Sequence, residues 1–229
     1  MSYRWLVKAG LVLLLVVLTG CSASHSNYTG TLGTLKLALF GTPDYQPTLA
    51  EIEASPYASQ VMRMNGGPQG LTILSGIFAT EKGRELRWTS ADGVSVITRH
   101  GRVVKIANWK ELEVSAFRAR QSDPLSLMHK QEAARFEYEL DYMPGYRDGV
   151  VFQSELKQQG MERHDILGQT RELLHIVEAV ESKTLNFRAT NHYWLDPASG
   201  HVVKSRQFPL PQISKGIEIT EAKPFGGRR

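Results

Sequence analysis

A histidine, a tryptophan and an aspartate follow one another at two-residue spacing in the segment 191–196. Successive side chains of a strand point to opposite faces, so His192, Trp194 and Asp196 share one face of the strand expected here. A tryptophan ring stacks on a pyranose ring and a carboxylate accepts hydrogen bonds from hydroxyls, which makes this face a candidate glycan-contact site. The simpler interpretation is a strand end beside the turn at 197–200.

Two other histidines stand close to carboxylates in the sequence. His175 and Glu178 have the i, i+3 spacing of a ligand pair on a helix, but in the strand expected at 173–180 this odd spacing places them on opposite faces. His164 and Asp165 are neighbours, which point apart on an extended chain, and we expect them in a solvated loop. The sequence therefore predicts no metal site at either place.

Three carboxylates alternate with apolar residues in the segment 131–142, the clearest strand of the chain. Glu137, Glu139 and Asp141 occupy one face at spacings of about 6.6–7 Å. A catalytic carboxylate pair requires one group to be desolvated so that its pKa rises, whereas three neighbouring carboxylates in water repel one another. We expect a hydrated outer face, with the apolar residues of the strand on the buried face, namely Phe136, Tyr138, Leu140 and Tyr142.

The common sequence signatures of enzymes are missing. The 229 residues contain no G-x-S-x-G, G-x-x-x-x-G-K-[ST], G-x-G-x-x-G or H-E-x-x-H motif. The single cysteine, Cys21, excludes an internal disulfide and any zinc site with two or more cysteines. With 41% hydrophobic and 22% charged residues the chain has the composition of a globular protein. We expect neither catalytic residues nor a cofactor.

Residues 1–20 have the pattern of a secretory signal peptide. Arg4 and Lys8 precede an apolar run over 9–18, which is too short for a membrane span of about 20 residues. The run ends in Leu18-Thr19-Gly20-Cys21, which resembles the bacterial lipobox, where the cysteine thiol receives a lipid and the chain is cut just before it. The alternative is an ordinary signal peptide with a chance cysteine. We predict lipidation of Cys21.

Lipidation carries two consequences for location and charge. Several acyl chains on one residue give stable anchoring to a membrane. Ser22 follows the cysteine, and by resemblance to the sorting rules of bacteria with two membranes, a residue other than aspartate there permits transfer to the outer membrane; we expect its periplasmic face. Cleavage removes Arg4 and Lys8 and lowers the formal net charge from +4 to +2. This smaller positive charge weakens the hypothesis that the protein binds a nucleic acid.

The mature chain is expected to form one β-rich domain over 34–225, after a flexible tether at 21–33 and before a tail at 226–229. Short helices are expected at 32–40 and at 48–54. About ten strands imply a curved antiparallel sheet that forms a barrel or half-barrel. The expected strands are 71–80, 85–90, 94–99, 102–107, 131–142, 150–157, 173–180, 185–195, 202–208 and 217–220.

Six segments stand out by their order and spacing, namely Glu53–Ser59, Leu86–Gly93, His100–Lys105, Asn191–Gly200, Ser205–Gln207 and Ile217–Pro224. Together they resemble the exopolysaccharide and group 4 capsule lipoproteins of the YjbF/GfcB type. A departure is Ala107-Asn108, where the family pattern leads us to expect a glycine. The resemblance implies a barrel-like antiparallel domain encoded among polysaccharide secretion genes, with no established catalytic activity and no catalytic residues to transfer.

The leading hypothesis is a non-enzymatic outer-membrane lipoprotein that assists the production or export of an exopolysaccharide or capsule. Its expected partners are the membrane, through Cys21, and other polysaccharide secretion proteins, the polysaccharide, or both. A second hypothesis is a lipid or lipoprotein carrier, because a half-barrel with an apolar concave face can hold acyl chains. A third is a glycan-modifying enzyme that uses His192 and Asp196.

Overall fold

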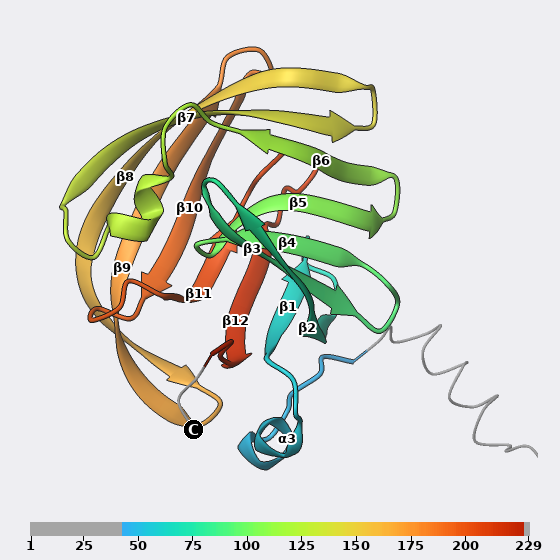
Figure 1. The fold of residues 1–229 in the computed structure, drawn as a ribbon, viewed down its shortest axis with the longest axis vertical. Helices are drawn as coiled ribbons and strands as arrows, with labels where there is room; N and C mark the ends of the chain where they lie inside the picture. Colours follow the sequence, from blue (N-terminus) through green and yellow to red (C-terminus); the bar gives the residue numbers. More distant parts are fainter. Residues whose placement is uncertain (1–42, 227–229) are drawn as a thin grey trace, which may run out of the picture. The chain divides into compact units, whose positions relative to one another are not determined.

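Alternating apolar and polar residues build a closed antiparallel β-barrel in the computed structural model, which describes residues 43–226 (Figure 1). Each strand pairs with the strand that follows it, and the first strand pairs with the last, so the meander closes on itself. The strands are β1 (Ser59–Met64), β2 (Gln69–Thr80), β3 (Gly83–Ser90), β4 (Ser95–Arg99), β5 (Arg102–Trp109), β6 (Leu112–Arg118), β7 (Ala133–Met143), β8 (Arg147–Ile166), β9 (Gln169–Ser182), β10 (Phe187–Leu195), β11 (Val202–Gln207) and β12 (Ile217–Lys223).

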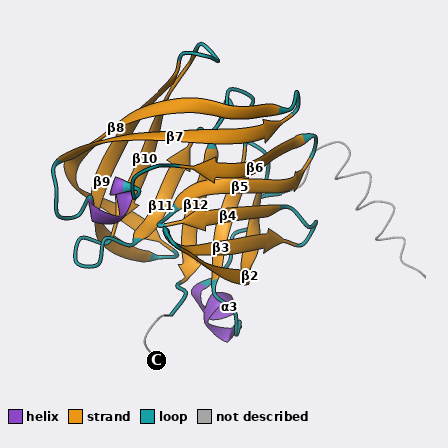
Figure 2. Cartoon of the chain, turned by 45° about the horizontal axis from the view of Figure 1, so that its top comes forward, coloured by secondary structure: helices purple, strands orange, loops and turns teal. Residues whose placement is uncertain are grey.

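Among residues 43–226, two short helices accompany the barrel: α3 (Leu49–Ala54) and the 3-10 helix η1 (Pro124–Leu127). Figure 2 shows α3 at one end of the strand wall, where Lys223 at the end of β12 donates to the carbonyl oxygen of Glu53 at 3.2 Å. The capping box predicted for α3 is confirmed. The Thr48 hydroxyl accepts from the Glu51 amide at 3.3 Å, and the Glu51 carboxylate accepts from the Thr48 amide at 2.7 Å.

Several sequence predictions fall outside the described residues. These are the signal peptide 1–20, the lipidated Cys21, the tether 21–33, the helix at 32–40 and, in the tail, residues 227–229. No helix within 43–226 is long and apolar enough to cross a membrane.

The predicted β-barrel is confirmed, but three elements differ from the sequence prediction. β1 and β6 were not expected. β1 opens with the buried polar residues Ser59 and Gln60 and so lacks an apolar alternation, whereas β6 alternates only over Leu112–Val114. β8 continues to Ile166, so the solvated loop predicted at His164-Asp165 is wrong. The polar second half of β8 is strand because its backbone pairs with β9, with His164 opposite Arg171.

The turn at His100-Gly101 folds the β4–β5 hairpin against β11. Gly101 has φ +85°, and a side chain there would collide with Val202, so this close approach requires glycine. Gln207 of β11 secures the hairpin, since its amide nitrogen donates to the Gly101 carbonyl at 2.9 Å and its oxygen accepts from the Val103 amide at 2.9 Å. Two strands that are not neighbours in the sheet are thereby joined across the barrel.

The alternation predicted for 131–142 is confirmed on β7. Phe136, Tyr138, Leu140 and Tyr142 are buried in the core. On the outer face Glu137 is exposed and Glu139 is half-buried, whereas the Asp141 carboxylate is largely covered and pairs with Arg118, so it is less hydrated than predicted. The Tyr138 ring stacks between two phenylalanines, with centroid distances of 4.7 Å to Phe117 and 5.3 Å to Phe152. Aromatic side chains therefore occupy the interior, where the carrier hypothesis requires a cavity. A small void beside Tyr138 and Arg102 measures only ≈10 Å³, about the space of one water molecule.

A charged network also lies inside the barrel, around Arg102 of β5. Its guanidinium donates to Asp123, in the loop before η1, and at 2.8 Å to Glu178 of β9. The same Glu178 oxygen accepts from the Tyr193 hydroxyl at 2.9 Å and from the Asn191 amide at 2.8 Å. All five residues are buried. The network therefore joins strands that are not neighbours in the barrel through charge-assisted hydrogen bonds.

The carboxylates keep this buried arginine ionised. Burial by itself lowers the pKa of Arg102, but Asp123 and Glu178 outweigh it and raise that pKa well above the ordinary value. Burial likewise raises the pKa of Glu178, and the attraction of Arg102 reverses this, so the pKa ends below its ordinary value. The rings of Phe136 and Tyr138, with centroids 5.3 and 5.6 Å from the guanidinium carbon, add cation–π contacts.

Substitutions on the two faces of β7 should differ in their effect on the free energy of unfolding. We expect Leu140→Ala to lower the free energy of unfolding by about 2–5 kcal/mol, because the side chain is 2% exposed in the core. Glu139→Gln on the exposed face should change it by no more than about 0.5 kcal/mol. Urea unfolding curves of both variants check this, and equal losses would contradict an exposed outer face of β7.

Removal of the Arg102 charge should destabilise the barrel more than removal of a surface arginine. We expect Arg102→Met to cost about 3–5 kcal/mol, because it leaves two buried carboxylates without their cation. Adding Glu178→Gln to that variant should recover part of the loss. Arg163→Met is the control, since the Arg163 side chain is 80% exposed. Equal unfolding midpoints for the two arginine variants would show that the network does not stabilise the fold.

Candidate functional site

Five side chains from three neighbouring strands form a cluster on the outer face of the barrel, here called the His–Trp cluster. β8 contributes Glu162 and His164, β9 contributes His175, and β10 contributes His192 and Trp194. Their chain neighbours, such as Ile176 and Tyr193, belong to the buried core. Alternation therefore places the cluster on the opposite face of the sheet.

Glu162 is the centre of the cluster. Its carboxylate accepts from Trp194 Nε1 at 2.7 Å, lies 2.7 Å from His175 Nδ1, and lies 3.2 Å from His164 Nε2. The hydrogen bond from Trp194 is the main cause that lowers the pKa of Glu162. His175 Nε2 lies 3.0 Å from His192 Nδ1, so a continuous chain of hydrogen bonds runs from Glu162 through His175 to His192.

The ring of Trp194 is covered on both faces. The His175 ring stacks on one face, with a centroid distance of 5.0 Å and an interplanar angle of 9°, and the Lys204 ammonium lies 5.2 Å from the ring centroid. His175 and Lys204 are the register partners of Trp194 on β9 and β11, so they approach the ring from opposite sides. A sugar ring that stacks on Trp194 must take the place of Lys204.

The electrostatics of the cluster favour a neutral His192. Burial lowers the pKa of this histidine, and the nearby charges of His175 and Arg206 lower it further. Arg206 is the register partner of His192 on β11. Within residues 43–226 no three His, Cys, Asp or Glu side chains are arranged to hold a metal ion. His192 also lines a groove, so a polar ligand there can bond its imidazole.

The three predicted glycan-contact residues do not all lie together. His192 and Trp194 lie together, with ring centroids 5.9 Å apart. Asp196 instead stabilises the β10–β11 turn, since its carboxylate accepts from the backbone amide of Ser199 at 2.9 Å and from its hydroxyl at 2.7 Å. His175 and Glu178 lie on opposite faces, as predicted, with Glu178 in the Arg102 network.

Sequence reasoning missed Glu162, His164 and His175 as members of one cluster. The signal was present only in the strand register, which pairs His175 with Trp194 on one side and with Gly160 on the other. A shift of register at Gln158/Gly160 lies between the cluster and the rest of the β8–β9 ladder. No spacing rule within a single strand predicts such a meeting of three strands.

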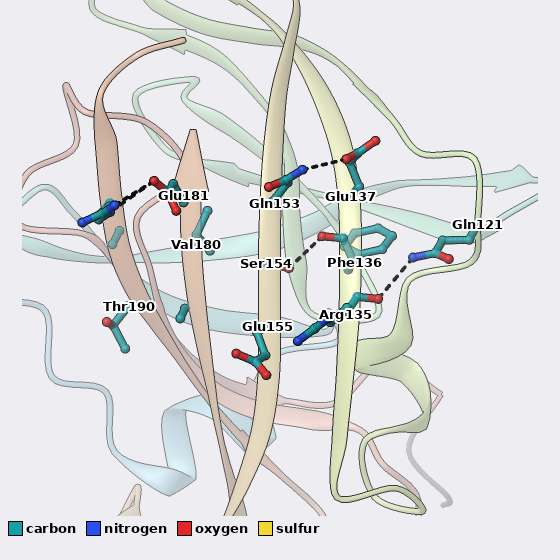
Figure 3. Close-up of a pocket in the computed structure, with 13 residues that line it drawn as sticks. Gln121, Arg135, Phe136, Glu137, Gln153, Ser154, Glu155, Val180, Glu181 and Thr190 are labelled. Carbon is teal, nitrogen blue, oxygen red and sulfur yellow. Dashed lines mark hydrogen bonds and ion pairs between the residues drawn. The ribbon is translucent and has the colours of Figure 1, made fainter. Parts of the chain in front are cut away.

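Two grooves adjoin on the outer face beside this cluster. The first, here called the basic groove, measures ≈480 Å³ and lies between β10 and the loop that joins β11 to β12. The second measures ≈890 Å³ and crosses β7 to β10 (Figure 3). Both grooves include Arg188, Ala189 and Thr190, so they meet at β10. The basic groove is lined by Phe187, Arg188, Ala189, Thr190, His192, Arg206, Phe208, Pro211, Ile213 and Ser214.

The larger groove has a mixed charge. Figure 3 shows Gln153 bonded to Glu137, at 3.1 Å, and Gln121 bonded to the carbonyl oxygen of Arg135, at 3.2 Å. Glu155 also lines this groove. The larger groove therefore differs from the basic groove in its charge, since Glu137, Glu155 and Glu181 line it together with Arg135 and Arg188.

Comparison with known proteins identifies the family. The family model described as "Group 4 capsule polysaccharide lipoprotein gfcB, YjbF" matches residues 32–221. The chain belongs to this family. The uncharacterized lipoprotein YjbF of Escherichia coli K12 is 40% identical over 98 residues, 43% of each chain. The uncharacterized lipoprotein GfcB of the same organism is 23% identical over 208 residues, 90% of this chain and 94% of GfcB.

A solved structure shares the fold. The crystal structure of the hypothetical lipoprotein YmcC from Escherichia coli K12 superposes with a TM-score of 0.68 at 22% identity, over 89% of this chain and 99% of that chain. The family and the antiparallel β fold expected from the sequence motifs are thus both confirmed.

The pKa of His192 should reflect its partial burial and the charges near it. We expect its pKa below the ordinary value of 6.5, because burial and the charges of His175 and Arg206 disfavour the imidazolium. The unfolded chain then binds this proton at a higher pH than the folded chain, so the free energy of unfolding falls as the pH drops below about 6.5. NMR titration measures the pKa directly.

Matched variants give the control for this titration. Arg206→Gln should raise the pKa of His192, because a nearby positive charge is removed. Arg163→Gln, which removes an exposed arginine of β8, should leave it unchanged. A pKa of 6.5 or above in the unaltered protein, or the same shift in both variants, contradicts the assigned surroundings of His192.

Proposed function

We propose that this protein is a non-enzymatic lipoprotein of the outer membrane that assists the production or export of an exopolysaccharide or capsule. The observation that carries the proposal is the match of the capsule polysaccharide lipoprotein family to residues 32–221. A lipid on Cys21 anchors the protein to the membrane, and Ser22 directs it to the outer one. The barrel then acts on the periplasmic face.

The distribution of polar groups supports a binding role. The strongest charged network, around Arg102, is enclosed in the core and faces no groove of useful size. The polar side chains that line the basic groove are arginines, a histidine and hydroxyl groups. The partners proposed are the polysaccharide, other polysaccharide secretion proteins, or both, and not a nucleic acid.

The anchor provides the direct test. Cys21→Ala should move the protein from the membrane fraction to the soluble fraction and lower surface polysaccharide, because the barrel is no longer held at the membrane. Fractionation with immunoblotting and a polysaccharide assay measure both effects. Ser24→Ala, three residues beyond the cysteine, is the control and should change neither. Full polysaccharide output from a stable, unlipidated Cys21→Ala protein contradicts the role of the anchor.

A further inference from the structure

The basic groove has an unbalanced charge. Its lining contains Arg188, His192 and Arg206 and no carboxylate. The nearest acidic partners lie outside the lining, where Glu181 lies 2.9 Å from Arg188 and Glu218 lies 3.7 Å from Arg206. Both ion pairs are solvent-exposed, and such pairs contribute little to stability. The groove therefore attracts an anionic ligand that can compete with these partners.

The two guanidinium groups retain free donors. Arg188 bonds Glu181 through Nε and Nη2, and Arg206 Nη2 donates to the carbonyl oxygen of Lys215 at 3.3 Å. Nη1 of each arginine has no hydrogen-bond partner among residues 43–226. The Arg188 and Arg206 side chains are 81% and 47% exposed. Guanidinium groups match the geometry of a carboxylate, which accepts two parallel hydrogen bonds.

The walls of the basic groove suit a sugar rather than a free anion. Phe187, Phe208 and Pro211 give apolar surface, against which the C–H faces of a pyranose can pack. Thr190 and Ser214 supply hydroxyl groups that can donate to or accept from sugar hydroxyls. The volume of ≈480 Å³ lies within the range of small-ligand sites.

The arrangement along β10 suits a polymer. Arg188 and His192 are four residues apart on this strand, and Arg206 is the register partner of His192. The two arginines thus stand about 14 Å apart along the strand direction, which is longer than one sugar ring. The basic groove also joins the larger groove at β10, so a chain can continue past the site.

We infer that the basic groove binds an acidic oligosaccharide, in which Arg188 and Arg206 each bond a carboxylate on a different sugar unit. Phe208 and Pro211 pack against the sugar rings. His192, which belongs to both the groove lining and the His–Trp cluster, forms a hydrogen bond with a sugar hydroxyl. This inference rests on the proposed function and names its ligand class as a polysaccharide with carboxylate groups.

Calorimetry with the full lipidated protein in detergent tests the inference. The probes are an oligogalacturonate and a neutral malto-oligosaccharide of the same number of sugars. We expect binding of the acidic probe only, with an affinity that falls as salt is raised. Arg188→Gln and Arg206→Gln should each weaken binding about tenfold, the effect of losing one exposed charge-assisted contact.

The control variant is Arg163→Gln, which removes an arginine as exposed as Arg188 that pairs with Glu172 outside the basic groove. Arg163→Gln should bind the acidic probe as the unaltered protein does, and all three variants should keep the thermal midpoint of the parent. Equal binding of the neutral probe, no binding of the acidic probe, or equal weakening by Arg163→Gln each overturns the inference.

The outcomes separate this inference from the proposed function. If the acidic probe does not bind while Cys21→Ala still lowers surface polysaccharide, the groove assignment is wrong and the accessory role stands. If the probe binds as expected while a stable Cys21→Ala protein gives full polysaccharide output, the groove assignment stands and the anchored role is wrong.

Discussion

The guanidinium of Arg102 is the contact on which the barrel interior depends. It joins β5 to β9, which are four strands apart in the barrel, and to the loop before η1. Asp123 also caps η1, where its carboxylate accepts from the Leu125 amide at 3.0 Å. A buried cation tolerates few arrangements of its partners, so this network restricts how the strands can close.

The same strands carry the interior network and the outer cluster. Asn191 and Tyr193 bond Glu178 inside the barrel, while His192 and Trp194, between and beside them, lie outside. Because side chains alternate along a strand, a slip of β10 by one residue would exchange the two sets. The buried hydrogen bonds therefore also hold the register that places His192 beside Arg206 and the basic groove.

Strong local signals in the sequence were sufficient for much of the fold. Strict alternation predicted the buried face of β7, and the capping box predicted α3. Both signals act within a few residues, through side-chain direction or a hydrogen bond three residues away. Ordered motifs made of turns and strand ends also pointed to the correct family.

The sequence by itself determined the β class, most strand positions and the separation of His175 from Glu178, because these follow from local alternation. Only the tertiary structure decided the closure between β1 and β12, the strand status of His164, the gathering of three aromatic N–H groups around Glu162, and the basic groove. Those features depend on register between strands distant in the chain, where backbone pairing overrides weak local preference.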